Sequence, residues 1–192
     1  MVSIMSEDPA QLTVDAQGVA SGARFVASPN FDARPTGVEV SLLVLHNISL
    51  PPGIFGGPAI IDLFCAALDH RAHPYYAGLR GLRVAAHFLI RRDGELIQFV
   101  ACARRAWHAG KSQWRGRSRC NDFSVGVELE GDDAVAYESR QYVQLARLTR
   151  ALQARYPLSD IVGHADIAPG RKSDPGPSFD WARYRADLAS PR

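Results

Sequence analysis

The apolar positions along this chain fall into short blocks that predict β-strands separated by helices. Residues 38–46 are almost continuously apolar, which is typical of a strand buried on both faces of a helix-covered sheet. Two more apolar runs, 84–90 and 95–100, flank a polar stretch containing Asp93-Gly94. Because Asp-Gly between apolar runs favours a tight turn, these two runs predict a β-hairpin.

Residues 123–130 alternate strictly and predict a further strand, and a short apolar run at 160–162 predicts another. In the alternating strand Glu128 points away from the apolar face, with Ser124 and Gly126 as small neighbours. We expect these small residues to leave space above the sheet for a ligand. The opposite, apolar face carries Phe123, Val125, Val127 and Leu129.

Three helices follow from apolar residues that recur with the helical period. The first begins with Pro58 at its first position, the second runs from Ser139 as N-cap to Tyr156, and the third starts near residue 178. The stripes expected to face the core are Ile61, Phe64, Cys65 and Leu68; Tyr142, Leu145, Leu148, Leu152 and Tyr156; and Trp181, Tyr184 and Leu188.

This order of elements predicts one α/β (α+β) domain with a central mixed β-sheet flanked by helices. Its 192 residues suffice for a core without disulfides. Residues 1–27 show no convincing periodicity, so we assign them to a partly irregular lead-in before a domain at 28–188.

Composition and charge restrict the possible partners. The chain has 22 basic and 20 acidic residues, a net charge of +2 that would not draw it to nucleic acid. No apolar run approaches the roughly 20 residues that span a bilayer, and the first residues lack the bases of a signal peptide. Three cysteines without a C-x-x-C pattern indicate reduced thiols. We therefore expect a cytoplasmic protein without nucleic-acid or membrane partners.

Residues 163–177 combine loop-forming residues with chemical groups. Gly and Pro after Ala168 predict an irregular loop, yet the stretch carries His164, Lys172 and Asp174. Loops held on a rigid scaffold often carry binding and catalytic groups. The alternative is an ordinary Asp-Pro-Gly turn beside a solvated lysine.

Two of the six histidines stand at predicted strand ends, where sites form in α/β sheets. His46 ends one strand and His164 follows another, although their separation in sequence does not show that they meet. His108, after Trp107, either lines a pocket or packs. His87 is expected to be a satisfied strand histidine, and His70 and His73 to lie on the surface.

If His46, His164 and Asp174 do meet, they form a plausible catalytic metal site. Two imidazoles and one carboxylate leave a tetrahedral zinc ion one open position. Glu128 would then act as general base for water, and Lys172 would stabilise the oxyanion formed on a carbonyl. Such a set is suited to metal-assisted hydrolysis of an amide.

Longer segments carry a resemblance to a known family. The chain resembles the zinc-dependent N-acetylmuramoyl-L-alanine amidases of the type-2 amidase and peptidoglycan-recognition superfamily, most of all the cytosolic members that recycle cell-wall fragments. The resemblance covers residues 28–185 and departs from the family pattern in residues 1–27 and at Ala59, Ala101 and Cys102. The matching segments are 43–53 (LVLHNISLPPG), 72–75 (AHPY), 87–94 (HFLIRRDG), 105–110 (RAWHAG), 120–131 (CNDFSVGVELEG) and 163–181.

The resemblance implies Zn²⁺ held by His46, His164 and Asp174, with Glu128 and Lys172 as catalytic residues. It implies the same fold and cleavage between the lactyl group of 1,6-anhydro-N-acetylmuramic acid and L-alanine. The expected partner is thus a small-molecule 1,6-anhydro-muropeptide, bound by a monomer, and a link to β-lactamase induction follows from the family.

Substrate contacts are implied at four further positions. Arg83 and Arg119 match family positions suited to grip peptide carboxylates, although either could be a solvated surface charge. Asn47 and Trp107 would hold the peptide backbone and the sugar.

The rival functions are a non-catalytic peptidoglycan-binding module, an exported amidase acting on intact wall, and a protein with a purely structural zinc. Filled ligand and catalytic positions favour an enzyme over a binding module. A signal peptide or wall-anchoring repeats would favour the exported amidase, and the sequence shows neither. An Asp ligand beside a free Glu and Lys argues against a structural zinc.

Overall fold

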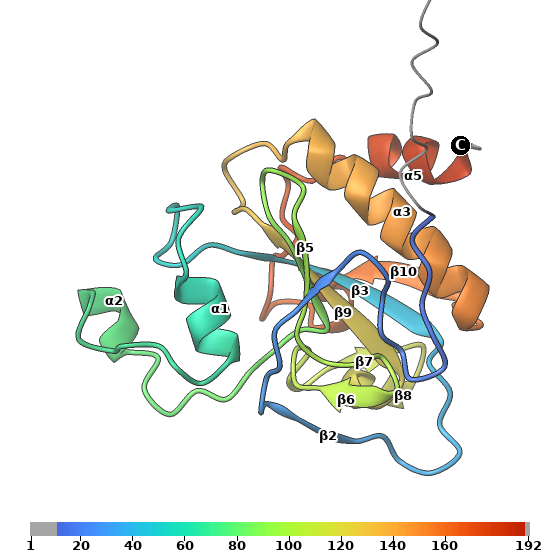
Figure 1. The fold of residues 1–192 in the computed structure, drawn as a ribbon, viewed down its shortest axis with the longest axis horizontal. Coiled ribbons are helices and arrows are strands. Elements are labelled where there is room, and N and C mark those ends of the chain that lie inside the picture. The colour runs from blue at the N-terminus through green and yellow to red at the C-terminus, as the bar shows by residue number, and fades with distance from the viewer. Residues whose placement is uncertain (1–10, 191–192) are drawn as a thin grey trace, which may run out of the picture.

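A six-stranded mixed sheet forms the centre of the molecule, in the order β1-β5-β4-β9-β3-β10 (Figure 1). This computed structural model describes residues 11–190. All neighbouring strands run parallel except β4 and β5, which form the predicted hairpin. The mixed sheet with helices around it confirms the predicted fold class. The strands are β1 (Arg24–Phe25), β3 (Leu42–Ile48), β4 (Phe88–Ile90), β5 (Leu96–Gln98), β9 (Ser124–Glu130) and β10 (Asp160–Gly163).

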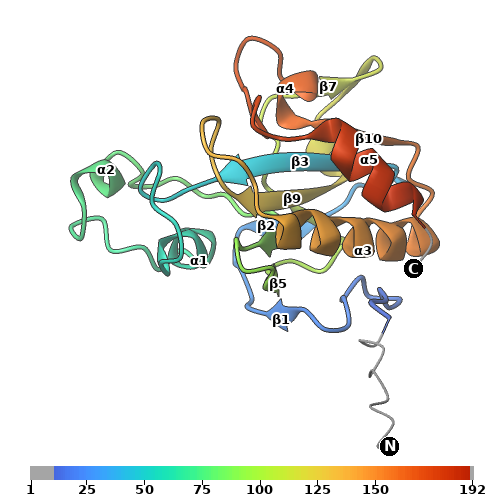
Figure 2. The ribbon, with the colours of Figure 1, turned by 90° about the horizontal axis from the view of Figure 1, so that it is seen from above.

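The two longest helices cover one face of this sheet, and shorter helices pack with side chains of the other face. Figures 1 and 2 show α3 (Ser139–Arg155) and α5 (Trp181–Ala189) side by side, with α1 (Ala59–Phe64) and α2 (Pro74–Ala77) grouped away from them. Small elements complete the domain. They are the antiparallel pairs β2 (Phe31–Ala33) with β6 (Arg104–Ala106) and β7 (Gln113–Trp114) with β8 (Arg117–Ser118), the 3₁₀ turn η1 (Cys120–Asp122), and α4 (His164–Ile167).

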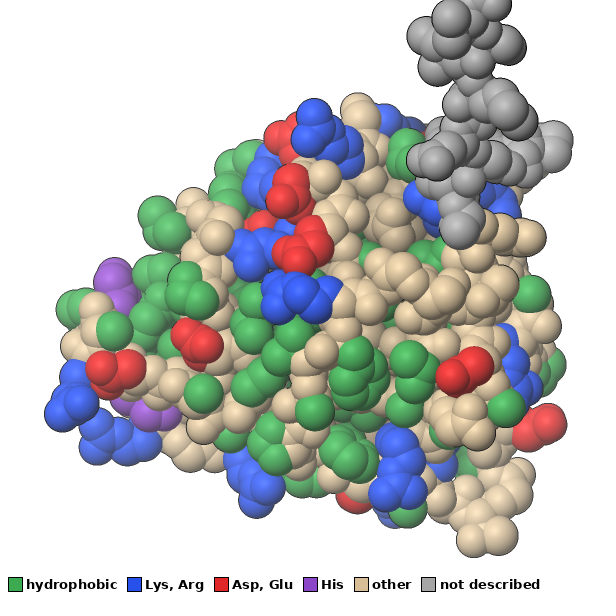
Figure 3. Space-filling model, viewed as in Figure 1, with side chains coloured by type: hydrophobic (Ala, Val, Ile, Leu, Met, Phe, Trp, Pro, Cys, Tyr) green, Lys and Arg blue, Asp and Glu red, His purple; other side chains and the backbone are tan. Residues whose placement is uncertain are grey.

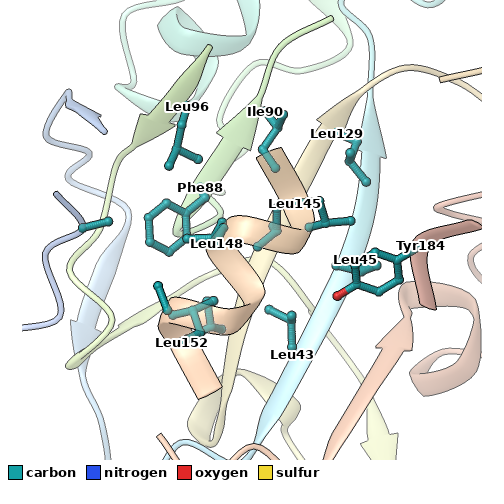
Figure 4. Close-up of a cluster of buried hydrophobic side chains, with 14 of the residues drawn as sticks. Leu43, Leu45, Phe88, Ile90, Leu96, Leu129, Leu145, Leu148, Leu152 and Tyr184 are labelled. Atoms are coloured by element: carbon teal, nitrogen blue, oxygen red, sulfur yellow. The ribbon is translucent and has the colours of Figure 1, made fainter. Parts of the chain in front are cut away.

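The main core lies between the sheet and α3. Figure 4 shows apolar side chains of four strands pointing toward one face of this helix. Each fully buried Leu or Phe contributes about 1.5–3 kcal/mol relative to an exposed one. The cluster includes Leu43, Leu45, Phe88, Ile90 and Leu129 from the strands and Leu145, Leu148 and Leu152 from α3, as predicted for the helix.

All three predicted helix starts differ from the observed ones, as α3 and α5 show first. Ser139 is the first helical residue of α3, and Glu138 is the N-cap; the Gln141 side chain accepts a hydrogen bond from the Glu138 N–H at 3.0 Å. The helix start is therefore satisfied by the side chain of Gln141, three positions after the N-cap, and Ser139 is not needed as a cap. The third helix, α5, starts at Trp181 rather than near 178 because Asp180 caps it by accepting from the Arg183 N–H.

The first helix buries only part of the stripe predicted for it: Phe64 is buried as predicted, and Leu68, also buried, lies beyond the end of the helix. Pro58 is the N-cap of α1, and the helix ends at Phe64, before Ala66 adopts a φ of 57°. Ile61 and Cys65 are only partly buried. Because α1 has fewer than two turns, its face is set by neighbouring segments and not by a long periodic pattern. The residues it buries are Ala59, Ile60, Leu63 and Phe64.

The described part of the N-terminal lead-in packs against the domain. Leu12 and Ala20 belong to the main core, and β1 pairs with β5 at the sheet edge. Buried Gln98 holds this segment, accepting from the Ala20 N–H at 2.8 Å and donating to the Gly18 carbonyl at 2.7 Å. Residues 1–10 of the predicted lead-in lie outside the described residues.

Acidic and basic side chains are interspersed on the face shown in Figure 3. Ion pairs such as Arg24–Glu95 and Arg92–Glu138, both 2.7 Å, join oppositely charged groups. Among residues 11–190, no helix combines the length and apolar character needed to cross a membrane.

Candidate active site

Strand register brings the predicted site residues to one end of the sheet. The pairing of β3 with β9 sets His46 opposite Glu128. The pairing of β10 with β3 sets Gly163 opposite Leu45, so the next residue, His164, follows at the level of His46. Because β3, β9 and β10 are parallel, their carboxyl ends meet at the same edge.

The segment after His164 folds back and returns Asp174 to this edge. It begins with the short helix α4, so the prediction of an irregular loop was wrong for its first residues. The Ala165 N–H donates to the Asp174 carbonyl at 2.9 Å, and the Tyr137 hydroxyl donates to the Pro175 carbonyl at 2.8 Å. A Cβ on Gly163 would lie 2.7 Å from the Pro175 ring, so this close return requires glycine there.

Three donor atoms converge in the resulting cluster. His46 Nδ1, His164 Nδ1 and Asp174 Oδ2 lie 3.0 Å from one another in each pair. All three residues are buried. Donors that share a zinc ion at about 2.0–2.2 Å lie roughly 3–3.5 Å apart, so the spacing fits one metal ion.

The hydrogen-bond pattern supports the same conclusion. The Ala109 carbonyl can only accept, so His164 Nε2, 3.1 Å away, carries the proton of the neutral imidazole. Its Nδ1 therefore turns a lone pair toward Asp174 Oδ2 and His46 Nδ1. Burial lowers the pKa of His46 to about 4, which favours its neutral form too. Lone pairs facing one another at this distance repel unless a cation lies among them.

Glu128 stands next to the cluster with one unsatisfied oxygen. The residue is buried, and its Oε2 has no hydrogen-bond partner. Burial, and secondly the charge of Asp174, raise the pKa of Glu128 well above its usual value, while Lys172 opposes the shift. A buried carboxylate that lacks a partner and faces a cleft is suited to accept a proton from a bound molecule.

The cluster opens into a cleft of about 760 Å³. Both predicted catalytic residues and predicted substrate-binding residues line this cleft. Lys172, Asn47 and Trp107 line it, and the Arg83 guanidinium lies 5.3 Å from the Trp107 ring centroid. Asn47 Nδ2 also donates to Asp133 at 2.9 Å. Arg119 does not belong to this lining; its Nε lies 3.2 Å from Asp122 Oδ2.

The expected open space above β9 is occupied. A Cβ on Gly126 would lie 2.5 Å from the His108 ring, so the small residue makes room for this imidazole and not for a ligand. His108 also contacts His46, with its Nδ1 2.9 Å from His46 Nε2. The sequence left His108 open between lining a pocket and packing, and the structure shows both, because His108 lines the cleft while its ring packs over Gly126. The small residues of β9 were the signal for the packing. His87 is satisfied as predicted, accepting from the Gly126 N–H and donating to the Arg104 carbonyl.

Comparison with known families decides the class of this protein. The sequence profile of N-acetylmuramoyl-L-alanine amidases matches residues 36–177, most of the chain. The chain belongs to this amidase family. It is therefore a hydrolase of amide bonds, and its His-His-Asp cluster is one that could hold a metal ion.

The similarity to individual relatives extends over nearly the whole length of this chain. It is 59% identical over 172 residues to the 1,6-anhydro-N-acetylmuramyl-L-alanine amidase AmpD of Citrobacter freundii, covering 88% of this chain and 92% of the relative. The crystal structure of a selenomethionine AmpD derivative superposes with a TM-score of 0.89 at 58% identity, covering 91% of this chain and 98% of that one.

A more distant amidase structure contains a substrate. The amidase AmiD of Escherichia coli, in complex with anhydro-N-acetylmuramic acid-L-Ala-D-γ-Glu-L-Lys, gives a TM-score of 0.56 at 30% identity. The match covers 92% of this chain and 65% of that chain.

Proposed function

We propose that this amidase is a zinc enzyme that hydrolyses the bond between the lactyl carbonyl of 1,6-anhydro-N-acetylmuramic acid and L-alanine. The observation that carries the proposal is the triangle of His46, His164 and Asp174 donor atoms beside the unpartnered carboxylate of Glu128. The names of the AmpD relatives support the anhydro-sugar substrate.

His46, His164 and Asp174 would hold the zinc ion. When bound, zinc acts as a Lewis acid that polarises a carbonyl and lowers the pKa of water to about 7. Two neutral imidazoles and one carboxylate leave a net positive charge at such a centre, which favours the developing oxyanion.

Glu128 would transfer the proton that the reaction must move. Its carboxylate takes a proton from the water that attacks the lactyl carbonyl carbon. As the carbon–nitrogen bond breaks, Glu128 returns this proton to the L-alanine nitrogen, which leaves as a free amine. Burial shifts the pKa of Glu128 upward, the direction that makes its carboxylate a stronger base.

Lys172 and the cleft residues would position the substrate. The Lys172 ammonium is exposed at the cleft and would donate to the carbonyl oxygen as it becomes negative. Asn47 and Trp107 would contact the peptide backbone and the sugar. Arg83 and Arg119 would bind carboxylates of the stem peptide, Arg119 only after its pair with Asp122 loosens.

The remaining proposals concern the setting of the reaction. We assign catalysis to residues 28–188, with residues 1–27 as a lead-in. We propose a monomer that acts on soluble fragments in the cytoplasm. The three cysteines, all free, support a reducing compartment.

The proposal is tested by mass spectrometry of anhydro-N-acetylmuramyl-tripeptide incubated with zinc-loaded protein, chelated protein and Glu128→Ala. Release of free tripeptide by the zinc-loaded wild type alone is the expected result. Zinc and substrate binding without release would make the protein a binding module. Full activity after complete zinc removal would contradict the metal site.

A further inference from the structure

We infer that His108 is a positioning residue of the metal site: it fixes the orientation and proton position of the ligand His46. The inference rests on the proposed zinc function and adds a residue to which that proposal gives no role. Two independent observations support it. The first is the set of hydrogen bonds that His108 makes, and the second is the packing of its ring over Gly126 of β9.

The first observation is a directed chain of hydrogen bonds. A metal ion among the donor atoms would use the Nδ1 lone pair of His46, so the proton of neutral His46 must be on Nε2. His46 Nε2 lies 2.9 Å from His108 Nδ1, which then accepts. This leaves the proton of His108 on Nε2, where it donates to Ser124 Oγ at 3.1 Å. Every ring nitrogen in this chain has one defined role.

The second observation is that the fold provides a place for this ring. His108 lies directly over Gly126, where any larger residue would collide with it, and its ring meets that of His46 edge-on with centroids 5.0 Å apart. Asn121 Oδ1 accepts from the backbone N–H groups of both His108 and Ala109, at 3.2 and 2.8 Å. The backbone that carries the imidazole is thus fixed as well.

One short segment therefore serves both histidine ligands. The Ala109 carbonyl accepts from His164 Nε2, and the adjacent His108 side chain accepts from His46 Nε2. Arg171 donates to the same Ala109 carbonyl at 2.9 Å and helps to hold the segment in place. Outer partners of this kind orient ligand imidazoles, and their loss costs about 10- to 100-fold in metal affinity.

The test measures zinc affinity by competition with a chelator, in the full-length protein, separately from activity. His108→Phe keeps the ring volume but removes the acceptor, and we expect it to bind zinc about 10- to 100-fold more weakly. His108→Asn places an oxygen near the position of Nδ1 and should recover most of that loss. His70→Phe, at a histidine outside the cleft, is the control and should match the wild type.

A second readout follows the Nε2 proton of His46. In the zinc-loaded wild type, NMR should show the His46 Nε2–H protected from exchange by its bond to His108, and His108→Phe should remove that protection. Should His108→Phe not fold, Ser124→Ala decides the question, because it removes the acceptor of His108 Nε2–H with little change in volume. A few-fold weaker zinc affinity is expected for that variant.

The outcomes separate this inference from the proposed function. Wild-type zinc affinity and unchanged exchange protection of the His46 Nε2–H in His108→Phe would overturn the inference, even if KM for the substrate rose. Failure of the wild type itself to bind zinc would overturn the metal proposal and this inference together.

Discussion

At the scale of single residues, hydrogen bonding distinguishes two kinds of buried polar side chain. Those with all partners in the protein stabilise the fold, and those with an unpartnered atom can act on a bound molecule. Buried Gln98 has both atoms of its side-chain amide satisfied by the backbone of Gly18, Ala20 and Val100. Glu128 keeps one buried oxygen without a partner. An unsatisfied buried oxygen costs about 1–3 kcal/mol, which is consistent with a group that acts on a bound substrate.

Glu128→Gln should abolish most of the activity while leaving the metal site intact. The amide has nearly the same shape but cannot accept and return a proton, so we expect kcat to fall about 10²- to 10⁴-fold. Zinc affinity should stay within a few-fold of the wild type, because Glu128 is not one of the three converging donors. Steady-state kinetics and chelator competition measure the two quantities, with exposed Glu39→Gln as the control. A variant with near wild-type kcat would exclude Glu128 as the base.

His87 should make stability depend on pH. Burial, and secondly the charge of Arg34, lower the pKa of His87 to about 3 from an ordinary 6.5. Between these values the unfolded chain binds a proton that the folded chain does not. The stability present above pH 6.5 is therefore lost as pH falls, by about 1.4 kcal/mol per unit.

Urea unfolding of the wild type and of His87→Gln at pH 7.5 and 5.0 measures this effect. The wild type should lose more free energy of unfolding than the variant over this interval, by about 1–2 kcal/mol. Other titrating groups are common to both proteins and cancel in the difference. Equal losses would show that His87 titrates normally in the folded protein.

At the scale of elements, β9 connects the main core with the site residues and with the loop that precedes α1. One face of the strand packs in the main core, and the other holds Glu128 and packs against the His108 ring. At its end the buried Glu130 accepts from the backbone N–H groups of Gly56 and Arg92, at 2.7 and 3.2 Å. The loop that leads into α1 is thereby tied to the strand that carries the proposed base.

Gly126→Ala should weaken zinc binding although residue 126 contacts none of the ligands. The new Cβ would lie 2.5 Å from the His108 ring, which must move away from His46. We expect zinc affinity to fall about 10-fold or more, as for loss of an outer partner. Gly57→Ala is the matched control, since a Cβ there meets open space. Equal zinc affinity in the two variants would show that the ring can shift without effect.

At the scale of the whole molecule, two distant parts of the chain, β3 and the segment 164–174, build one metal site on a single core. Residues 46, 164 and 174 come from β3, the start of α4 and the loop after it. A ligand that binds only the folded state stabilises it through mass action. Metal binding should therefore be visible in the stability of the entire domain.

Zinc should raise the melting temperature of the protein. At a free zinc concentration about 1,000 times Kd the added stability is about 4 kcal/mol, or roughly 8–16 °C for a domain of this size. Asp174→Ala should lose most of this shift, whereas Asp62→Ala, on α1 and outside the cluster, should keep it. Scanning calorimetry with and without chelator gives the measurement. An equal zinc shift in both variants would exclude Asp174 as a ligand.

The sequence by itself determined five strands of the central sheet, the hairpin, the long helix and the identity of the chemical groups, whereas the short strands β1, β2, β6, β7 and β8 lay in segments without a strand prediction. Strand 124–130 and helix α3 were predictable because hydrophobic period reflects which face is buried, a property of neighbouring residues. Glu128 could be placed opposite the apolar face for the same reason. The resemblance supplied the ligand set, which spacing alone left open.

The tertiary structure decided which of these groups meet. Parallel pairing of β3 with β9 and β10 sets His46 beside Glu128 and His164, and such register depends on contacts far apart in sequence. The same holds for the buried face of the short helix α1 and for the ring of His108 over Gly126. A local pattern records whether a residue is buried, whereas the partner that buries it is fixed only when the whole chain packs.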